Sequence, residues 1–304
     1  MEIDTRFPTK LNSLSEAPEP FGGALVENLP SGEPARLVLY APAFQTEDEK
    51  SPATLLAVTD TGWLVASAAE GGVTQEKADF SNTLYIELTP VLLECRLRIF
   101  FAAEGTPRSA GIRFETVGEE LYREAIDLIL AGVDPALTGA AGQDRSAVSM
   151  PQDWPLKIRN EARRFWPGGQ RLVEAIQWPA VSDESRRQLG PAGALLVTER
   201  ELVVISDEQK SSEDTLAADE LEESFAGIIT FIPHVRLAEF QVSRQGQVSV
   251  LTLQVKAAHG GEKLEYALPV ETETAVSRAL DQMLRSGSSR NQATTENPVR
   301  DTAG

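Results

Sequence analysis

The chain has 304 residues, of which 41% are hydrophobic, and its 28 Lys and Arg against 46 Asp and Glu give a formal net charge of -18. Single cores stop growing at roughly 250 residues, so this length favours two domains. The acidic charge argues against nucleic acid and against stable membrane binding. Because Cys95 is the only cysteine, a disulfide within the chain and a cysteine-rich metal site are both excluded.

The N-terminal sequence MEIDTRFPTK lacks the basic and then apolar order of a signal peptide. No apolar run in the chain reaches the roughly 18–20 residues that span a bilayer. We therefore expect a reducing, aqueous location such as the cytoplasm.

In chain order, composition predicts five segments. Residues 1–24 mix Pro, Ser and Glu without periodicity and predict a flexible arm, and a first β-rich domain is expected over residues 25–132. Residues 133–150, rich in Ala, Gly, Ser and Asp, predict a mobile linker. A second domain with a leading helix is expected over residues 151–286. The tail, residues 287–304, has almost no apolar residue and should be disordered.

The two expected domains resemble each other in sequence, and the matches keep the same order in both copies. The distance between matched segments only grows along the chain, as expected when copies of one unit differ by insertions. The four matches are residues 30–44 on 167–181, 56–67 on 195–206, 80–94 on 225–239, and 125–130 on 279–284. We therefore expect a tandem of two units, and one continuous sheet across both halves would contradict their separation.

Within each copy, strands come first and a helix comes last. Residues 193–206, GALLVTERELVVIS, predict a hairpin with a turn at Thr198–Glu201. Further antiparallel strands are expected over residues 235–242, 247–255 and 263–268. In the first copy, every second residue from Leu93 to Phe101 is apolar, and this row of side chains is expected to face the core, which makes Cys95 a core residue. That row is Leu93, Cys95, Leu97, Ile99 and Phe101.

The closing helices are amphipathic, and Gly132 and Gly287 stand where a helix C-terminus favours glycine. The leading helix of the second copy is expected to be capped by Asp153, with Pro155 in its first turn. Three apolar faces are expected: Val117, Leu121, Ala125, Leu128 and Ile129; Val276, Ala279, Leu280, Met283 and Leu284; and Trp154, Ile158, Ala162 and Phe165.

The second copy resembles the bacterial pleckstrin-homology-like domains, which are relatives of the GRAM domain. The resemblance is carried by Gly169-Gln170, by Gly193, Leu195, Thr198 and Leu202 in the hairpin, by Ile232-Pro233, and by the helix from about Glu271 to Leu284. It implies two mainly β, partly open barrels or sandwiches, each capped by a C-terminal helix. The first copy has a shorter span after residue 94, so it is expected either to lack a strand or to pair two short ones there. Members of this fold mostly bind proteins, peptides or lipid head groups.

The sequence offers little catalytic machinery. Its two histidines, His234 and His259, are explained by a strand edge and a turn, and no nucleophile elbow, phosphate loop or dinucleotide fingerprint is present. The acidic clusters at residues 47–49, 213–214 and 219–220 lack calcium-loop spacing. We therefore expect a non-enzymatic interaction or scaffold protein that binds a protein or peptide partner and needs no cofactor or metal. A carboxylate- or Cys95-dependent enzyme is the alternative, and homo-oligomer formation stays open.

One concentration of positive charge runs against the net charge and is the candidate ligand-binding site. Under the resemblance, the loop after the first strand of the second copy is where lipid phosphates are held. Anionic lipid head-group binding is therefore a second alternative, opposed by the acidic neighbours Asp183 and Glu184. The candidate residues are Lys157, Arg159, Arg163, Arg164, Arg186 and Arg187.

Overall fold

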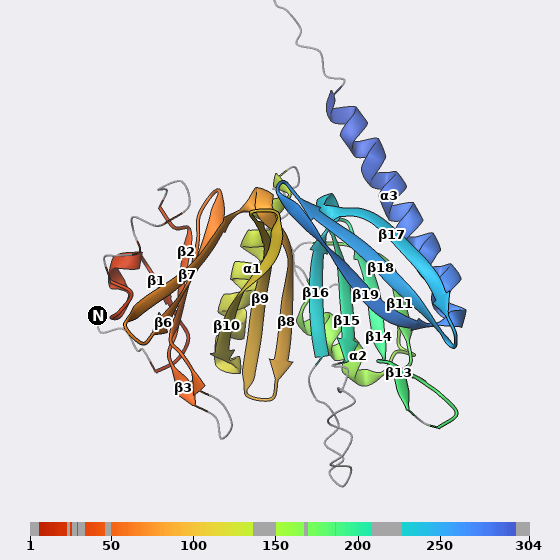
Figure 1. Cartoon of the computed structure of the whole chain (residues 1–304), viewed down its shortest axis with the longest axis horizontal. Helices are drawn as coiled ribbons and strands as arrows, with labels where there is room; N and C mark the ends of the chain where they lie inside the picture. Colours follow the sequence, from red (N-terminus) through yellow and green to blue (C-terminus); the bar gives the residue numbers. More distant parts are fainter. Residues whose placement is uncertain are drawn as a thin grey trace, which may run out of the picture.

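A computed structural model shows that the described part of the chain is mainly β, with several antiparallel sheets and three α-helices (Figure 1). None of the helices described combines the length and the apolar character needed to cross a membrane. The structure describes residues 6–22, 25, 29, 34–45, 50–135, 150–166, 170–185, 187–207 and 227–295.

The first half contains a five-stranded sheet in the order β1-β2-β5-β6-β7, followed by a meander and a helix. The sheet strands are β1 (Thr9–Leu11), β2 (Leu37–Ala41), β5 (Thr54–Val58), β6 (Gly62–Ala69) and β7 (Gly72–Asp79), with a small hairpin of β3 (Phe44–Gln45) and β4 (Lys50–Ser51). The 3-10 helix η4 (Phe80–Asn82) then leads to β8 (Thr83–Val91), β9 (Glu94–Ala103), β10 (Thr106–Glu115), η5 (Thr116–Gly118) and α1 (Glu119–Val133).

The second half repeats this order after the short helix α2 (Leu156–Arg164). Four long strands are followed by a three-stranded meander and a helix. These elements are β11 (Leu172–Trp178), the small hairpin of β12 (Val181–Ser182) and β13 (Gln188–Gly190), β14 (Gly193–Thr198), β15 (Glu201–Asp207), β16 (Gly227–Pro233), η9 (His234–Arg236), β17 (Leu237–Gln245), β18 (Val248–Ala257), β19 (Gly260–Pro269), η10 (Val270–Thr272) and α3 (Glu273–Thr295).

The two halves share one seven-stranded sheet in the order β10-β9-β8-β16-β15-β14-β11. At its centre β8 pairs antiparallel with β16, with Thr230 opposite Glu87. This pairing contradicts the expectation of two separate β units, and none of the described sheets closes into a barrel. The physical reason lies in the runs LYIEL and IITFI, which are apolar except for Glu87 and Thr230 and are typical of strands inside a sheet.

The repeat holds at the level of elements, but one sequence match is wrong. The structure equates Phe80 with His234, a shift of 234 − 80 = 154 that then persists without a gap through η5 and η10 to the closing helices. The sequence match had placed Phe80 on Phe225. The apparent missing strand of the first copy came from that error, because β8, β9 and β10 have full counterparts in β17, β18 and β19.

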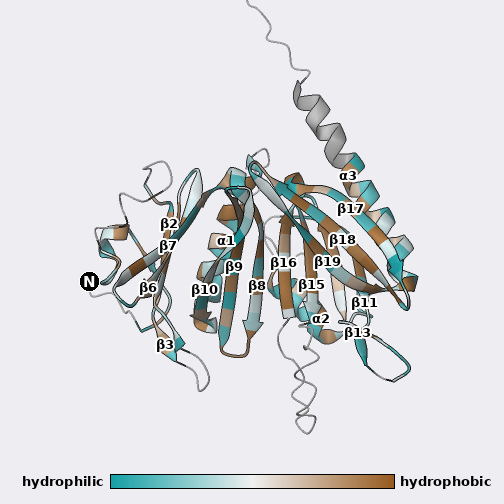
Figure 2. Ribbon diagram, viewed as in Figure 1, coloured by the Kyte–Doolittle hydropathy of each residue, from teal (hydrophilic) through white to brown (hydrophobic). Residues whose placement is uncertain are grey.

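The strands β15 and β16 in the middle of the shared sheet are buried on both faces, and hydrophobic residues, drawn brown, are frequent along them (Figure 2). On one face, Leu97 and Ile99 pack in a cluster with the first sheet, α1 and α2. On the other face, Phe100 and Ala102 join a cluster with β18, β19 and α3. Cys95 is buried as predicted, whereas Leu93 lies in the turn between β8 and β9 and is 84% exposed, so its assignment to the core was wrong.

The predicted hairpin forms as β14 and β15, and a threonine hydroxyl closes its turn. The Thr198 Oγ1 accepts hydrogen bonds from the backbone N–H groups of Arg200, at 3.1 Å, and Glu201, at 2.8 Å. In the first half Thr59 Oγ1 accepts from Thr61 and Gly62 in the same way. Both copies therefore use the same side-chain-stabilised turn, at Val58-Thr59-Asp60 in the first and at Val197-Thr198-Glu199 in the second.

The predicted flexible arm is partly ordered and buried. Within residues 6–22, β1 pairs with β2, and Leu11, Leu14 and Phe21 pack on the outer face of the first sheet. At the other end, α3 runs to Thr295, past the expected boundary at residue 286. Most of the predicted linker, residues 136–149, lies outside the described residues, as do the acidic clusters at 47–49, 213–214 and 219–220.

Three further helix predictions need correction. The buried face of α1 is centred on Tyr122, Ala125, Ile126 and Ile129, while Val117 is 70% exposed. Helix α2 starts after Pro155, which is itself the N-cap residue, so Asp153 does not cap it. Its apolar face is buried as predicted, and so is that of α3 from Val276 to Met283. Gly132 lies inside α1 against the ring of Phe80 and does not end the helix.

Candidate functional site

The predicted basic residues do not form one positive surface. Lys157 on α2 pairs with Asp207 at the end of β15, with 2.5 Å between Nζ and Oδ1. Arg164 makes a two-pronged ion pair with Glu119 at the start of α1, and this partner raises the pKa of the guanidinium. These charges are used inside the molecule to hold α2 to its neighbours.

The remaining candidates are scattered. Arg159 donates to the backbone oxygen of Gln152 at 3.1 Å, and Arg163 is exposed on α2. Arg187 is exposed on the hairpin of β12 and β13, where its backbone N–H donates to Asp183 Oδ1. Arg186 lies outside the described residues.

The hairpin that carries Arg187 lies on the far side of the shared sheet from α2. Its Gly190 packs against Ala267 of β19, whereas α2 belongs to the cluster on the opposite face. The structure therefore does not bring the two groups of cations together.

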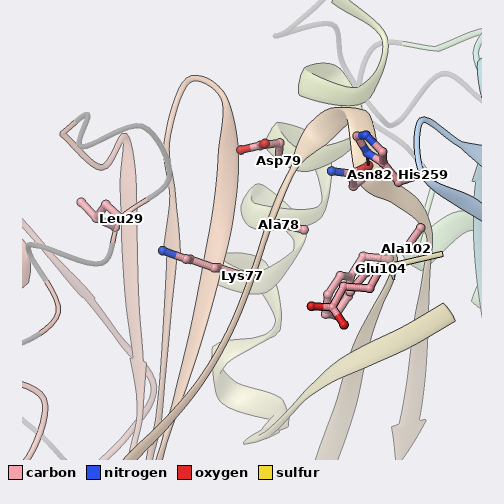
Figure 3. Close-up of a pocket in the computed structure, with 10 residues that line it drawn as sticks. Leu29, Lys77, Ala78, Asp79, Asn82, Ala102, Glu104 and His259 are labelled. Atoms are coloured by element: carbon pink, nitrogen blue, oxygen red, sulfur yellow. Dashed lines mark hydrogen bonds between the residues drawn. The ribbon is translucent and has the colours of Figure 1, made fainter. Parts of the chain in front are cut away.

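A different feature, the junction pocket, lies where the two halves meet (Figure 3). It encloses about 360 Å³ between the end of β7, η4, the end of β9 and the turn between β18 and β19. The lining residues are Leu29, Lys77, Ala78, Asp79, Asn82, Phe101, Ala102, Ala103, Glu104 and His259.

Direct hydrogen bonds between the halves hold the wall of this pocket. The ring nitrogen Nδ1 of His259 lies 2.7 Å from Oδ1 of Asn82, and the N–H of Ala258 donates to the carbonyl of Ser81 at 3.1 Å. The close approach of this turn requires Gly260, because a Cβ there would lie 3.1 Å from the Cβ of Ala102. The first half thus supplies most of the lining, and His259 of the second half completes one side of it.

Arg236 of η9 binds the backbone around the same η4 segment. Its guanidinium donates to the carbonyl oxygens of Phe80 at 2.7 Å and Thr83 at 2.8 Å. Burial lowers the pKa of Arg236, and the nearby carboxylate of Asp134 opposes that shift. Two buried carbonyls are satisfied in this way, so the backbone that presents Asn82 is fixed.

Chemically, the junction pocket combines an apolar floor with a charged rim. Phe101, Ala102 and Ala103 of β9 supply the apolar surface, while the rim carries the cation Lys77 and the carboxylates Asp79 and Glu104. Such a composition suits an apolar side chain whose flanking groups are polar or charged.

The thiol of Cys95 and the carboxyl group of Glu201 are buried away from the junction pocket. Burial raises the pKa of the Cys95 thiol to about 12, with the Glu119 carboxylate adding to the shift, so at neutral pH the thiol is protonated. Burial also raises the pKa of Glu201 to about 7, although a hydrogen bond from Gln170 opposes it. Glu201 lies beside the turn threonine Thr198 and inside the fold.

Sequence reasoning placed His259 in a turn, which is where it lies between β18 and β19, but missed its contact with Asn82. It also missed Lys77, Asp79 and Glu104 as pocket residues. These three occur in ordinary polar stretches, so no pattern in the sequence distinguishes them. A scan against protein-family models finds no match for this chain, and a search of curated proteins finds none.

Proposed function

We propose that this protein is a non-enzymatic interaction protein that binds a protein or peptide partner at the junction pocket. The observation that carries the proposal is a pocket lined mainly by the first half, to which the second half adds His259, held by its hydrogen bond with Asn82. A binding surface built by two halves of a chain responds to the arrangement of both, which suits a scaffold.

Each half, in this proposal, is a pleckstrin-like unit. The support is the order of elements, since each half runs through four long strands, a three-stranded meander and a closing helix. Such units serve mainly in binding, although one fold hosts many functions and the analogy alone is weak. The burial of Cys95, with its raised pKa, further favours binding over thiol chemistry.

The partner segment is expected to insert one apolar side chain against Phe101 and Ala102. The charged rim of the pocket then contacts the groups that flank this side chain in the partner. Lys77 faces an acidic group or a carbonyl of the partner, and Glu104 faces a basic group or an N–H. About 360 Å³ is near the lower end of the range of ligand sites, which fits one side chain with its backbone.

Site-specific photo-crosslinking in the native source tests this proposal. A photoreactive residue is placed at Lys77 or Glu104, and a matched control is placed at exposed Asn160 on α2. We expect one discrete adduct from the two pocket positions and none from the control. The variant Ala103→Trp, which fills the pocket, should abolish the adduct. Adducts that are identical at all three positions, or absent from the pocket positions, would refute the proposal.

A further inference from the structure

The internal repeat means that the chain contains two copies of the elements that form the junction, and only one copy of each is used. The pair of strands that forms the junction is β8 with β16. Ile86, Glu87 and Leu88 of β8 lie opposite Phe231, Thr230 and Ile229 of β16. With the shift of 234 − 80 = 154, the counterpart of β8 is β17 and the counterpart of β16 is β7. Both counterparts are edge strands, each paired on one side only.

Edge strands expose unpaired backbone groups, and proteins protect them with charge, proline, bulges or short length. The edge β7 is protected in this way, because Glu76 and Lys77 occupy the positions that Thr230 and Phe231 occupy in β16. Both side chains are exposed. Pairing of β7 from one molecule with β17 of the next, which would propagate into a filament, is therefore disfavoured.

The other described edges of the large sheets carry similar protection. β1 has three residues, β10 carries Pro107 and Arg108, β11 has a register irregularity next to Glu174, and β19 carries Glu262, Lys263 and Glu265.

β17 has a register irregularity between Leu237 and Glu239 as well, and Glu239 and Arg244 flank its centre, but the central part of the strand differs from these edges. Its residues Phe240, Gln241, Val242 and Ser243 include no charge, proline or glycine. Phe240 and Val242 are only partly buried against the core of the second half, whereas their counterparts Ile86 and Leu88 are fully covered in the used junction. β17 therefore pairs with β18 alone, although α3 also contacts it, and a further strand at its other edge would cover these apolar side chains.

We propose that β17 pairs antiparallel with β17 of a second copy of this chain, about a two-fold axis at Gln241. This register places Phe240 of each copy opposite Val242 of the other copy. The two apolar pairs formed in this way extend the core across the interface. Glu239 then lies opposite Ser243, and Arg244 opposite Ala238, so no like charges face each other. The contact is closed, because the same surface of each copy is used.

The overall charge of -18 on each chain opposes such a dimer at long range. Salt screens this repulsion, while strand pairing and apolar contact are not weakened by screening. The dimer should therefore become tighter as ionic strength rises, which distinguishes it from an association that depends on ion pairs.

Sedimentation of the full chain over a range of concentrations and salt tests the proposal. We expect a monomer–dimer equilibrium that shifts toward dimer in higher salt. The variant Gln241→Lys places two lysines opposite each other on the axis, and Gln241→Glu places two glutamates there. Each variant alone should dimerise about tenfold more weakly or worse, whereas a mixture of the two should form a heterodimer. Gln241 is exposed in the monomer, so both variants should fold normally.

Disulfide formation tests the register independently. Gln241→Cys should give a covalent dimer on mild oxidation, because the two residues face each other at the axis. Arg244→Cys is the matched control, since the two copies of residue 244 would lie roughly 20 Å apart. Cys95 is buried and does not compete. A wild-type chain that stays monomeric at every concentration and salt, a Gln241→Lys variant that dimerises like wild type, or equal crosslinking at both positions overturns the proposal.

Discussion

Replacement of Gly132 by alanine is expected to destabilise the protein although alanine is the better helix former. A Cβ at this position of α1 would lie 2.2, 2.4 and 2.5 Å from three atoms of the Phe80 ring, whereas carbon atoms in contact are normally about 3.5–4.0 Å apart. The ring cannot withdraw easily, because it is 7% exposed and the carbonyl of its own residue is held by Arg236 at 2.7 Å.

The magnitude follows from two opposing effects. Alanine in place of glycine inside a helix stabilises by roughly 0.5–1 kcal/mol. Forcing an extra carbon into a packed core costs roughly 1–3 kcal/mol. We therefore expect Gly132→Ala to lower the free energy of unfolding by about 1–2 kcal/mol.

Urea denaturation followed by tryptophan fluorescence measures this change. The control Gly111→Ala, in edge strand β10, adds a Cβ that meets nothing within 4 Å and should leave stability nearly unchanged. In the background Phe80→Leu, which makes room beside α1, the cost of Gly132→Ala should shrink, giving a clear coupling energy. If Gly132→Ala is as stable as wild type, or if its cost is the same in both backgrounds, the packing argument is wrong.

Three further outcomes are expected. The folded-state pKa of Glu201 is raised from 4.5 to about 7, so its contribution to the free energy of unfolding is most favourable below pH 4.5 and is lost as the pH rises through 7. Glu201→Gln should therefore be more stable than wild type at pH 8 and should lose this advantage near pH 4.5, as measured by denaturation at a series of pH values. Cys95 should react with a thiol reagent only on unfolding, since it is buried and its pKa is raised to about 12; rapid modification of the native protein would contradict this. Anionic vesicles at physiological salt should not co-sediment with the protein, and pelleting that is abolished by Arg186→Glu with Arg187→Glu would establish the lipid alternative.

The sequence by itself determined the local elements and their repetition. The hairpin of β14 and β15 was predictable because alternation and the polar Thr198–Glu201 break are local signals. Cys95 was predictable as a core residue for the same reason, since a two-residue period assigns alternate side chains to opposite faces of a strand. The order of strands and closing helix in each half followed from the repeat.

The tertiary structure decided which strand edges meet and therefore where the junction pocket lies. Pairing between β8 and β16 joins residues more than a hundred positions apart, and a two-residue period carries no information about the partner of a strand. Phe100 and Ala102 lie in the cluster on the other face of the shared sheet from Cys95, where the second half covers them. The contact between Asn82 and His259 depends on that arrangement, so His259 joins the pocket only when the shared sheet brings the halves together.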